Sequence, residues 1–258
     1  MRRLEKVTKA KLWPFLTLII LASMLSCDNE DEPSVPDQEY DITLNTTAFG
    51  NVLSASNGMT LYFFTRDVAG ASECNGGCVT NWPPLLAENF TVEPGLDQTL
   101  FSTITRDDGN DQVTYKGWPL YFFANDNAAG DVNGEDVGGA WYVAKPDYDI
   151  LLAAQEVNGA VSRYLVDSFG QSLYTFTNDD PNVSNCSGGC LNAWPIYGEI
   201  DLEIPSILNG GDFASISTEG NTHTTYQNQP LYYFNNDASR GDVNGHEVNN
   251  VWFLRAIQ

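Results

Sequence analysis

Two short cysteine segments are the parts of this chain whose residue types and spacing most directly suggest chemistry. Cys74 and Cys78, and likewise Cys186 and Cys190, are separated by three residues that end in Gly-Gly. Glycine lets the backbone turn sharply, so each pair can come within disulfide range. An exported chain also meets an oxidising compartment, where disulfides persist. We therefore predict two short-loop disulfides.

A thiolate metal site is the alternative use of these cysteines. Each pair could hold a soft ion such as Cu(I), or the two pairs could meet as a four-cysteine zinc site. No His follows the second Cys of either pair, so covalent c-type haem attachment is not indicated. His223 and His246 stand where the first half of the chain has Gln112 and Glu135, so a His-containing site could exist in one half at most.

Oxygen donors gather around a Gly-Asp-Val-Asn-Gly segment that occurs at 130–134 and 241–245. Calcium favours such loops, and Asp-x-Asn-Gly is similar to the start of a calcium loop, although the full twelve-residue pattern is absent. The alternative is an Asn-Gly hairpin turn with solvated acids. The candidate calcium ligands are Asp131, Asn133, Glu135, Asp242, Asn244 and Glu247. Calcium or a thiolate-bound metal aside, we expect no cofactor.

No constellation of residues identifies a reaction. The two histidines lack a local signature, so neither a Ser-His-Asp nor a Cys-His arrangement is supported. We predict that the protein is not an enzyme.

A Tyr-x-Phe-x-x-Asp motif is written four times along the chain. In an extended strand its Tyr and Phe share one face, and because both faces are apolar the strand is expected to be covered on both sides. The Asp lies beyond the apolar run, where an Asx-type turn would satisfy backbone donors, so we predict a structural role. The motif residues are Tyr62, Phe64, Asp67; Tyr121, Phe123, Asp126; Tyr174, Phe176, Asp179; and Tyr232, Phe234, Asp237.

Five tryptophans follow the signal-like segment and could form a sugar-stacking platform, but we favour core packing, because aromatic residues dominate core burial. Four recur between the halves of the chain, as core residues of a duplicated domain would: Trp82, Trp141, Trp194 and Trp252. Trp118 has Gln229 in its place, so Trp118 is the one expected to be exposed.

The elements that carry these motifs arise from a tandem duplication. The block around the cysteines recurs after 112 residues and the following block after 111. Short runs rich in Val, Ile, Thr, Tyr and Phe alternate with turn-forming clusters, which is typical of strands. Examples are 50–54, 101–105, 112–116 and 251–255. No segment after the first 26 residues shows a helical period.

We therefore predict an all-β fold made of two tandem, internally duplicated antiparallel β domains. The first spans 40–148 and the second 158–258, with a join at 149–157, and each is of ordinary domain size. The alternative is one closed, propeller-like body in which the four units act as blades.

The N-terminal segment predicts export. Basic residues in the first eleven positions precede an apolar run at 12–25, which indicates a signal peptide over 1–26. The segment Met24-Leu25-Ser26-Cys27 resembles a loose bacterial lipobox, and Cys27 is the cysteine left over once the other four are paired. We predict lipidation at Cys27, followed by an acidic, disordered tether at 27–39. Such an acidic run resembles the surface-export signal of Bacteroidetes lipoproteins.

Charge narrows the choice of partner. The whole chain carries 12 Lys and Arg against 34 Asp and Glu. Removing residues 1–26 leaves seven basic and 33 acidic side chains, a formal net charge of −26. Nucleic acid is therefore not an expected partner, because phosphate binding needs clustered cations. Solubility at a crowded surface accounts for the charge, and attraction of divalent cations or of a basic partner is the alternative.

The tandem Tyr-x-Phe-x-x-Asp motif, with its neighbouring Cys-x3-Cys, Trp-Pro and Gly-Asp-x-Asn-Gly segments, resembles the secreted-repeat lipoprotein family over roughly residues 58–258. The resemblance implies a secreted or lipid-anchored repeat protein of unknown function and supplies no catalytic residues.

These observations lead to one expectation and two alternatives. We expect a lipid-anchored outer-membrane protein, periplasmic or surface-exposed, that serves as a non-enzymatic binding or structural module, with the membrane as partner through Cys27. Whether the other partner is a protein, a glycan or a divalent cation stays open. The alternatives are a metal-handling or electron-transfer accessory protein and a carbohydrate-binding surface protein.

Overall fold

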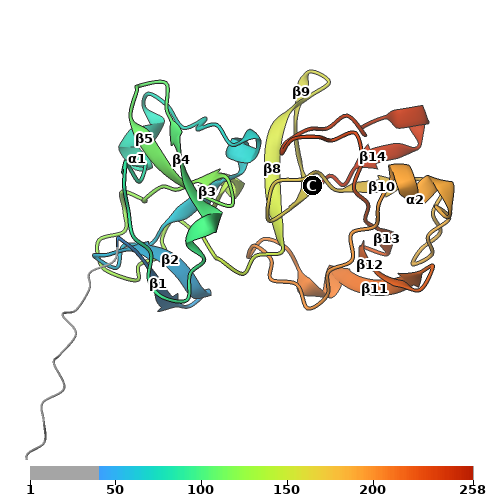
Figure 1. Ribbon diagram of the computed structural model, residues 1–258, viewed down its shortest axis with the longest axis horizontal. Coiled ribbons are helices and arrows are strands. Elements are labelled where there is room, and N and C mark those ends of the chain that lie inside the picture. The colour runs from blue at the N-terminus through green and yellow to red at the C-terminus, as the bar shows by residue number, and fades with distance from the viewer. Residues whose placement is uncertain (1–40, 258) are drawn as a thin grey trace, which may run out of the picture. The chain divides into compact units, whose positions relative to one another are not determined.

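The computed structural model describes residues 41–257, which consist of short strands, turns and short helical segments (Figure 1). The predicted signal peptide, the tether up to residue 39 and Cys27 lie outside the described residues. The described strands form small antiparallel sheets of two or three strands. These sheets remain separate, which fits tandem all-β units rather than one closed body and confirms the predicted fold class.

The two halves repeat the same order of elements, except that η1 has no counterpart in the second half. The first half contains β1 (Ile42–Thr47), β2 (Gly50–Ala55), β3 (Tyr62–Phe64), η1 (Thr65–Ala69), α1 (Cys78–Asn81), η2 (Gln98–Leu100), β4 (Phe101–Thr105), β5 (Asp111–Tyr115), β6 (Trp118–Pro119), η3 (Val137–Gly139) and β7 (Trp141–Val143). The second half contains β8 (Ile150–Val157), β9 (Ala160–Asp167), β10 (Tyr174–Phe176), α2 (Gly189–Ala193), η4 (Gly210–Asp212), β11 (Phe213–Thr218), β12 (Asn221–Tyr226), β13 (Gln229–Pro230), η5 (Val248–Asn250) and β14 (Trp252–Leu254).

The predicted join at 149–157 is largely strand. Residues 150–157 form β8, which pairs antiparallel with β9 from Ile150↔Asp167 to Val157↔Ala160. This hairpin repeats the β1–β2 hairpin at the start of the first half. Asn158 and Gly159 close its two-residue turn with positive φ, which suits an Asn-Gly hairpin. The second half therefore begins with its own hairpin, and the division into two domains stays a prediction, since the described residues form one compact unit.

The repeated motifs pair with one another through the backbone. Tyr62 and Tyr121 form an antiparallel bridge, and Tyr174 and Tyr232 form the same bridge in the second half. The residues from Leu61 to Phe64 are all buried, so the strand is covered on both faces as its sequence predicts. Each half is therefore built from two motif copies that meet in its core.

Trp118 is buried, because the second half of the chain covers it. Its side chain is 1% exposed, its Nε1 donates a hydrogen bond to the Ser168 carbonyl at 3.0 Å, and the Arg240 guanidinium lies 4.7 Å from its ring centroid. The prediction that Trp118 is the exposed tryptophan is therefore wrong. The equivalent positions in the other half are Gln229 and Ala129, so this contact has no symmetric copy.

Arg240 completes the contact between the halves. It donates from Nε to the Val68 carbonyl at 2.6 Å and from Nη1 to the Lys116 carbonyl at 2.9 Å. Burial lowers the pKa of Arg240 to about 10, which leaves it charged at neutral pH. Trp118 and Arg240, which differ from their equivalents in the other half, therefore contribute to the contact between the halves.

Candidate functional site

The Tyr and Asp side chains of the repeated motif pair across the two copies within each half. In the first half the Tyr62 hydroxyl donates to Asp126 Oδ2 at 2.7 Å, and the Tyr121 hydroxyl donates to Asp67 Oδ2 at 2.6 Å. The second half repeats both bonds, with Tyr174 to Asp237 at 2.6 Å and Tyr232 to Asp179 at 2.7 Å. No Tyr in these four bonds uses the Asp of its own motif. The sequence analysis did not predict this pairing between motif copies, although the even number of copies is consistent with it.

The second oxygen of each carboxylate holds a loop. Asp67 Oδ1 accepts the backbone N–H of Glu73 at 2.8 Å, and Asp126 Oδ1 accepts that of Asn133 at 2.9 Å. Asp179 and Asp237 accept from Asn185 and Asn244 in the same way. The predicted role in satisfying backbone donors is thus seen, but the loops span six or seven residues rather than one Asx turn. Each Asp therefore ties a loop to a strand from the other motif.

Burial changes the acidity of both partners. Desolvation raises the pKa of Asp67 to about 7, against stabilising hydrogen bonds from Tyr121 and Glu73. It also raises the pKa values of Asp126, Asp179 and Asp237 and those of the four motif tyrosines. At neutral pH the tyrosines are therefore protonated donors. The carboxylates of Asp67 and Asp126 are buried, whereas those of Asp179 and Asp237 are half-buried.

A stack of four aromatic rings lies beside these pairs in each half. Phe64, Trp141, Trp82 and Phe123 follow one another at centroid separations of 4.1, 3.8 and 4.3 Å. The second half repeats the stack with Phe176, Trp252, Trp194 and Phe234 at 4.3, 3.8 and 4.2 Å. The indole faces cover one another, and all four of these tryptophans are buried, so the core interpretation is confirmed.

The Gly-Asp-Val-Asn-Gly loops close against the motif tyrosines. The Gly134 N–H donates to the Tyr62 hydroxyl at 3.2 Å, and the Gly245 N–H donates to the Tyr174 hydroxyl at 3.3 Å. A Cβ on Gly134 would lie 2.7 Å from Tyr62 Cε1 and 2.9 Å from Trp82 Cη2. The glycine is needed for this close approach. The alternative of an Asn-Gly hairpin turn at this segment is wrong, since no paired strands flank it.

Replacing Gly134 by Ala is expected to lower the free energy of unfolding by about 1–3 kcal/mol, because the methyl group overpacks the Tyr62 and Trp82 rings. Urea denaturation measures this loss. Gly77→Ala is the matched control, since a Cβ there meets nothing within 4 Å and its φ is −65°. Equal effects of the two substitutions would contradict the assignment.

Three of the six candidate calcium ligands, Asp131, Asp242 and Glu135, accept backbone N–H groups. Asp131 Oδ2 accepts the N–H groups of Asn127 and Ala128, and Asp242 Oδ2 accepts those of Ala238 and Ser239. Glu135 Oε2 accepts the Val143 N–H. The side-chain amides of Asn133 and Asn244 donate to nearby carbonyls, and Glu247 accepts from Asn158. Within residues 41–257 no three His, Cys, Asp or Glu side chains are grouped to hold a metal. Calcium therefore stays a prediction without geometric support.

Both predicted disulfides are present. Cys74 bonds to Cys78 and Cys186 to Cys190, with Cα–Cα distances of 5.3 and 5.4 Å. In this state the sulfur atoms are joined to each other and are not free thiolates. A one-turn helix, α1 or α2, follows each loop. The loops therefore act as covalent staples on the surface of each half.

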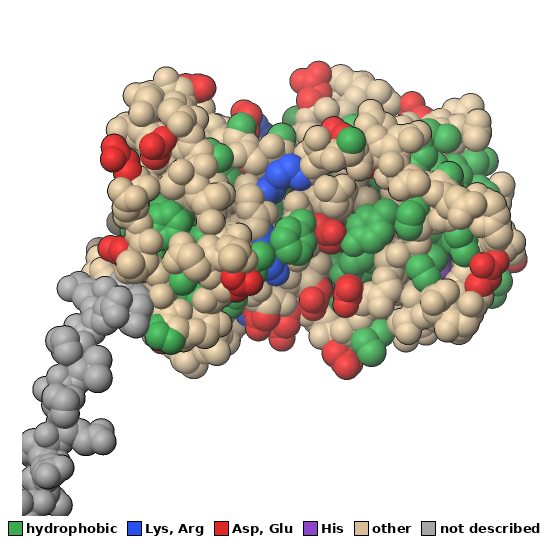
Figure 2. All heavy atoms as spheres, viewed as in Figure 1, with side chains coloured by type: hydrophobic (Ala, Val, Ile, Leu, Met, Phe, Trp, Pro, Cys, Tyr) green, Lys and Arg blue, Asp and Glu red, His purple; other side chains and the backbone are tan. Residues whose placement is uncertain are grey.

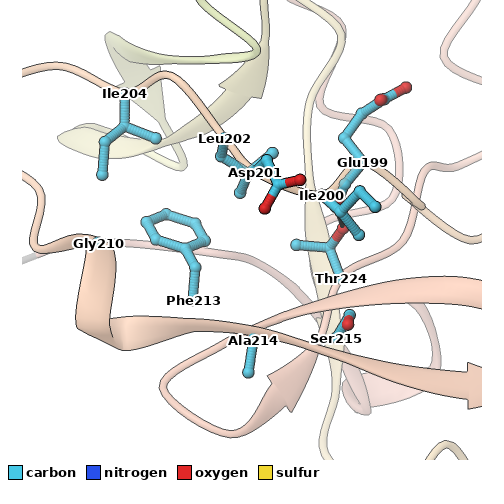
Figure 3. Close-up of a pocket in the computed structure, with 10 residues that line it drawn as sticks. All are labelled: Glu199, Ile200, Asp201, Leu202, Ile204, Gly210, Phe213, Ala214, Ser215 and Thr224. Atoms are coloured by element: carbon cyan, nitrogen blue, oxygen red, sulfur yellow. Dashed lines mark hydrogen bonds between the residues drawn. The ribbon is translucent and has the colours of Figure 1, made fainter.

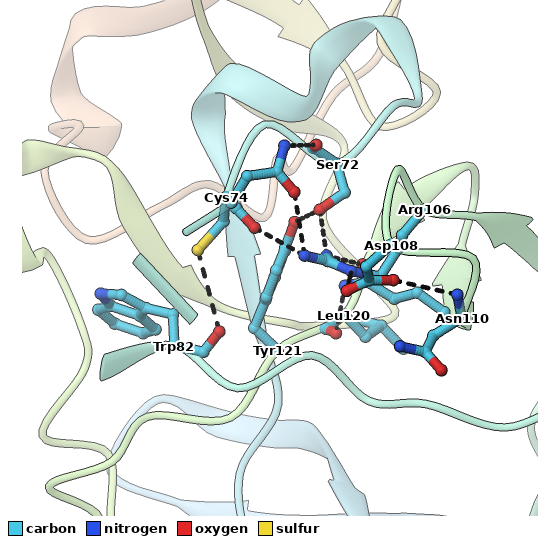
Figure 4. Close-up of polar contacts among 10 residues, drawn as sticks. Ser72, Cys74, Trp82, Arg106, Asp108, Asn110, Leu120 and Tyr121 are labelled. Carbon is cyan, nitrogen blue, oxygen red and sulfur yellow. Dashed lines mark hydrogen bonds and ion pairs between the residues drawn. The ribbon is translucent and has the colours of Figure 1, made fainter. Parts of the chain in front are cut away.

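Arg106 ties the first disulfide loop to a motif tyrosine (Figure 4). Its Nη2 donates to the Cys74 carbonyl at 2.9 Å, its Nη1 donates to Gln112 Oε1 at 2.6 Å, and Nη1 also contacts Ser72 Oγ. Ser72 in turn shares a 2.7 Å hydrogen bond with the Tyr121 hydroxyl. A buried guanidinium with this many acceptors is a structural tie rather than an open anion site.

The second half replaces this tie with a neutral histidine. His223 stands at the Gln112 position and is fully buried. Its Nε2 lies 2.8 Å from the Leu231 carbonyl, which can only accept, so Nδ1 accepts from Thr218 Oγ1 at 2.9 Å. His246 is also structural, since its Nδ1 accepts the Leu254 N–H where Glu135 accepts from Val143. Both histidines therefore make hydrogen bonds that hold the fold together.

Acid is expected to destabilise the protein through His223. Burial lowers the pKa of His223 below its ordinary 6.5, so below about pH 6.5 the unfolded chain takes up a proton that the folded protein resists. The free energy of unfolding contributed here therefore falls as pH falls. His223→Gln places the residue of the first half here and removes the titrating group, so the melting temperature of the natural protein should fall relative to that of the variant from pH 7.5 to 5. A constant difference would contradict the assignment.

Comparisons with known proteins follow the repeat. A family model described as a secreted repeat of unknown function matches residues 43–86, 102–145, 158–197 and 214–254. Each match contains one copy of the motif. No curated protein and no solved structure matches the chain.

Proposed function

Because the chain belongs to this family of secreted repeats, we propose that it is an exported, lipid-anchored protein that acts as a non-enzymatic binding or structural module at the cell envelope. The proposal places it in the outer membrane, facing the periplasm or the surface. Its membrane contact would be the lipid on Cys27, preceded by a basic segment and an apolar run. Among the described residues no helix is long and apolar enough to span a membrane.

One observation carries the non-enzymatic part of the proposal. The four Tyr–Asp bonds use every Tyr and Asp of the repeated motif inside the protein. A catalytic group needs to reach the reacting atoms of a substrate. The residues that define the repeat are therefore best explained as a scaffold, and the loops that differ between the halves are left as the surface on which partners would be recognised.

The two alternatives gain less support. A metal-handling role could use the cysteine pairs or the Gly-Asp-Val-Asn-Gly loops. The cysteines would have to be thiolates, and both pairs are joined as disulfides. In the loops, Asp131 and Asp242 accept backbone N–H groups. A carbohydrate platform made from the tryptophans would require exposed indole faces, and all five are buried. We therefore keep the binding or structural module as the proposal.

Lipid labelling tests the anchor. The full chain is expressed in a Gram-negative host fed an alkyne fatty acid, and the envelope fraction is probed for label. We expect label and detergent-dependent extraction for the natural protein and neither for Cys27→Ala. Cys78→Ala is the control for loss of a cysteine elsewhere. Label that persists in Cys27→Ala would refute lipidation at this residue, and turnover abolished by a single point change would refute the non-enzymatic role.

A further inference from the structure

A cavity of about 280 Å³ opens beside β11, between that strand and residues 199–204 (Figure 3). Its apolar side is formed by Phe213, Leu202 and Ile204, and Asp201 and Glu199 contribute carboxylates. The remaining lining residues are Ile200, Gly210, Ala214, Ser215 and Thr224. None of them is basic.

A comparison of the two halves gives the physical reason for this cavity. In the first half, Phe90 packs edge-on against Phe101 with ring centroids 6.2 Å apart, and Phe101 is only 6% exposed. The positions 112 residues later are Leu202 and Phe213. The other side of each ring is covered alike, by Tyr115 and Tyr226 at 4.7 Å. Replacement of the aromatic residue by Leu therefore leaves one side of Phe213 open.

The charge at the edge of this cavity also differs between the two halves. Asp201 and Glu199 occupy positions that are Asn89 and Ala87 in the first half. In Figure 3 the Asp201 carboxylate points toward the part of the cavity that contains the Phe213 ring. The Glu199 carboxylate points away from that ring. Among the described residues the Asp201 side chain has no hydrogen-bond or ion-pair partner. Figure 2 shows acidic side chains scattered over the face in view and few basic ones, consistent with a net charge of −22.

We propose that this cavity binds a small organic cation that carries an apolar arm. The arm lies against the open face of Phe213 beside Leu202 and Ile204, and the ammonium group pairs with Asp201. An ammonium near an aromatic face gains further from the ring quadrupole, and the negative field of the protein raises the local concentration of cations. The inference rests on the proposed binding role, for which it names a site and a ligand class.

Three probes of similar shape test the charge: phenethylammonium, neutral 2-phenylethanol and anionic 3-phenylpropionate. Each is titrated into the full protein, purified from the cell envelope in detergent, while the Ile204 δ1-methyl resonance is followed by NMR. We expect a saturating shift with phenethylammonium, a weaker one with 2-phenylethanol and none with 3-phenylpropionate. Equal binding of the cation and the anion would overturn the assignment of charge.

Two variants test the residues. Leu202→Phe refills the cavity with the residue that the first half already tolerates, and we expect it to weaken phenethylammonium binding at least tenfold. Asp201→Asn keeps the shape, and we expect it to cost roughly threefold to fivefold in affinity for the cation, as for an exposed ion pair, and to leave 2-phenylethanol unchanged. Phe90→Leu is the matched control in the first half and should not alter the titration.

The outcomes separate this site from the broader proposal. If Leu202→Phe melts like the natural protein and still binds phenethylammonium unchanged, the cavity is not the site. If the natural protein binds none of the probes, the ligand class is wrong. Neither result bears on the proposed lipidation of Cys27 or on the proposed lack of enzymatic activity. These are measured on the same preparations by lipid labelling and by substrate screens.

Discussion

Replacing Trp141 by Ala is expected to lower the free energy of unfolding by about 3–5 kcal/mol, the range for removing a large buried aromatic side chain. Trp141 stacks on Trp82 at 3.8 Å and on Phe64 at 4.1 Å, and it meets Tyr121 edge-on at 5.1 Å. Its loss leaves a cavity between two rings that no neighbour can fill. The loss would also free the Tyr121 ring, which carries one of the two Tyr–Asp bonds of the first half.

Denaturant unfolding followed by tryptophan fluorescence and by circular dichroism measures this effect. Trp252→Ala is the matched variant, because Trp252 holds the same place between Trp194 and Phe176. We expect similar losses for the two substitutions. A loss below about 1 kcal/mol at Trp141 would mean that the stack is not a core element, since such small effects are typical of surface sites.

Replacing Asp67 by Ala is expected to cost about 2–4 kcal/mol, because it removes the acceptor of a buried hydroxyl and of a backbone N–H at once. Asp67 is fully buried and accepts from Tyr121 at 2.6 Å and from Glu73 N at 2.8 Å. A double-mutant cycle with Tyr121→Phe isolates the side-chain bond, and its coupling energy should be about 1.5–3 kcal/mol. Additive losses would show that the two residues do not act as a pair.

The same residue predicts a pH dependence. The folded-state pKa of Asp67 is raised to about 7, above its ordinary 3.8, so the folded protein binds this proton more tightly than the unfolded chain. That contribution to stability is fully present below about pH 4 and is lost as pH rises through 7. The contribution of Asp67 to the free energy of unfolding should therefore be larger at pH 5 than at pH 8, opposite in sign to the contribution of His223. Asp67→Asn should reduce this difference, and an unchanged difference would contradict the assignment.

The four Tyr–Asp hydrogen bonds give a physical reason for the repeat that the family description names. Because each Tyr reaches the Asp of the neighbouring motif copy, one copy alone leaves both residues without their partners. Two copies satisfy each other. The structural unit of the repeat is therefore a pair of copies, and this chain contains two such pairs.

Several features of the protein could be predicted from its sequence because they depend on local patterns. The two disulfides join residues four apart, the strands follow the alternation of apolar residues and turn formers, and the duplication is visible by self-comparison. The recurrence of Trp82, Trp141, Trp194 and Trp252 between the halves also favoured core packing. Each of these signals lies within one repeat or compares two repeats position by position.

The tertiary structure decided everything that depends on which distant groups meet. The Tyr–Asp partners are 53 to 64 residues apart, and the sequence of four copies of one motif does not show which Asp each Tyr meets. Trp118 is buried because Arg240 and Ser168 of the other half reach it. Gly134 is required because of a ring that packs on it from Tyr62. The cavity beside Phe213 lies where Leu202 stands in the place that Phe90 holds in the first half, and a volume left between segments is a property of packing that no local period encodes.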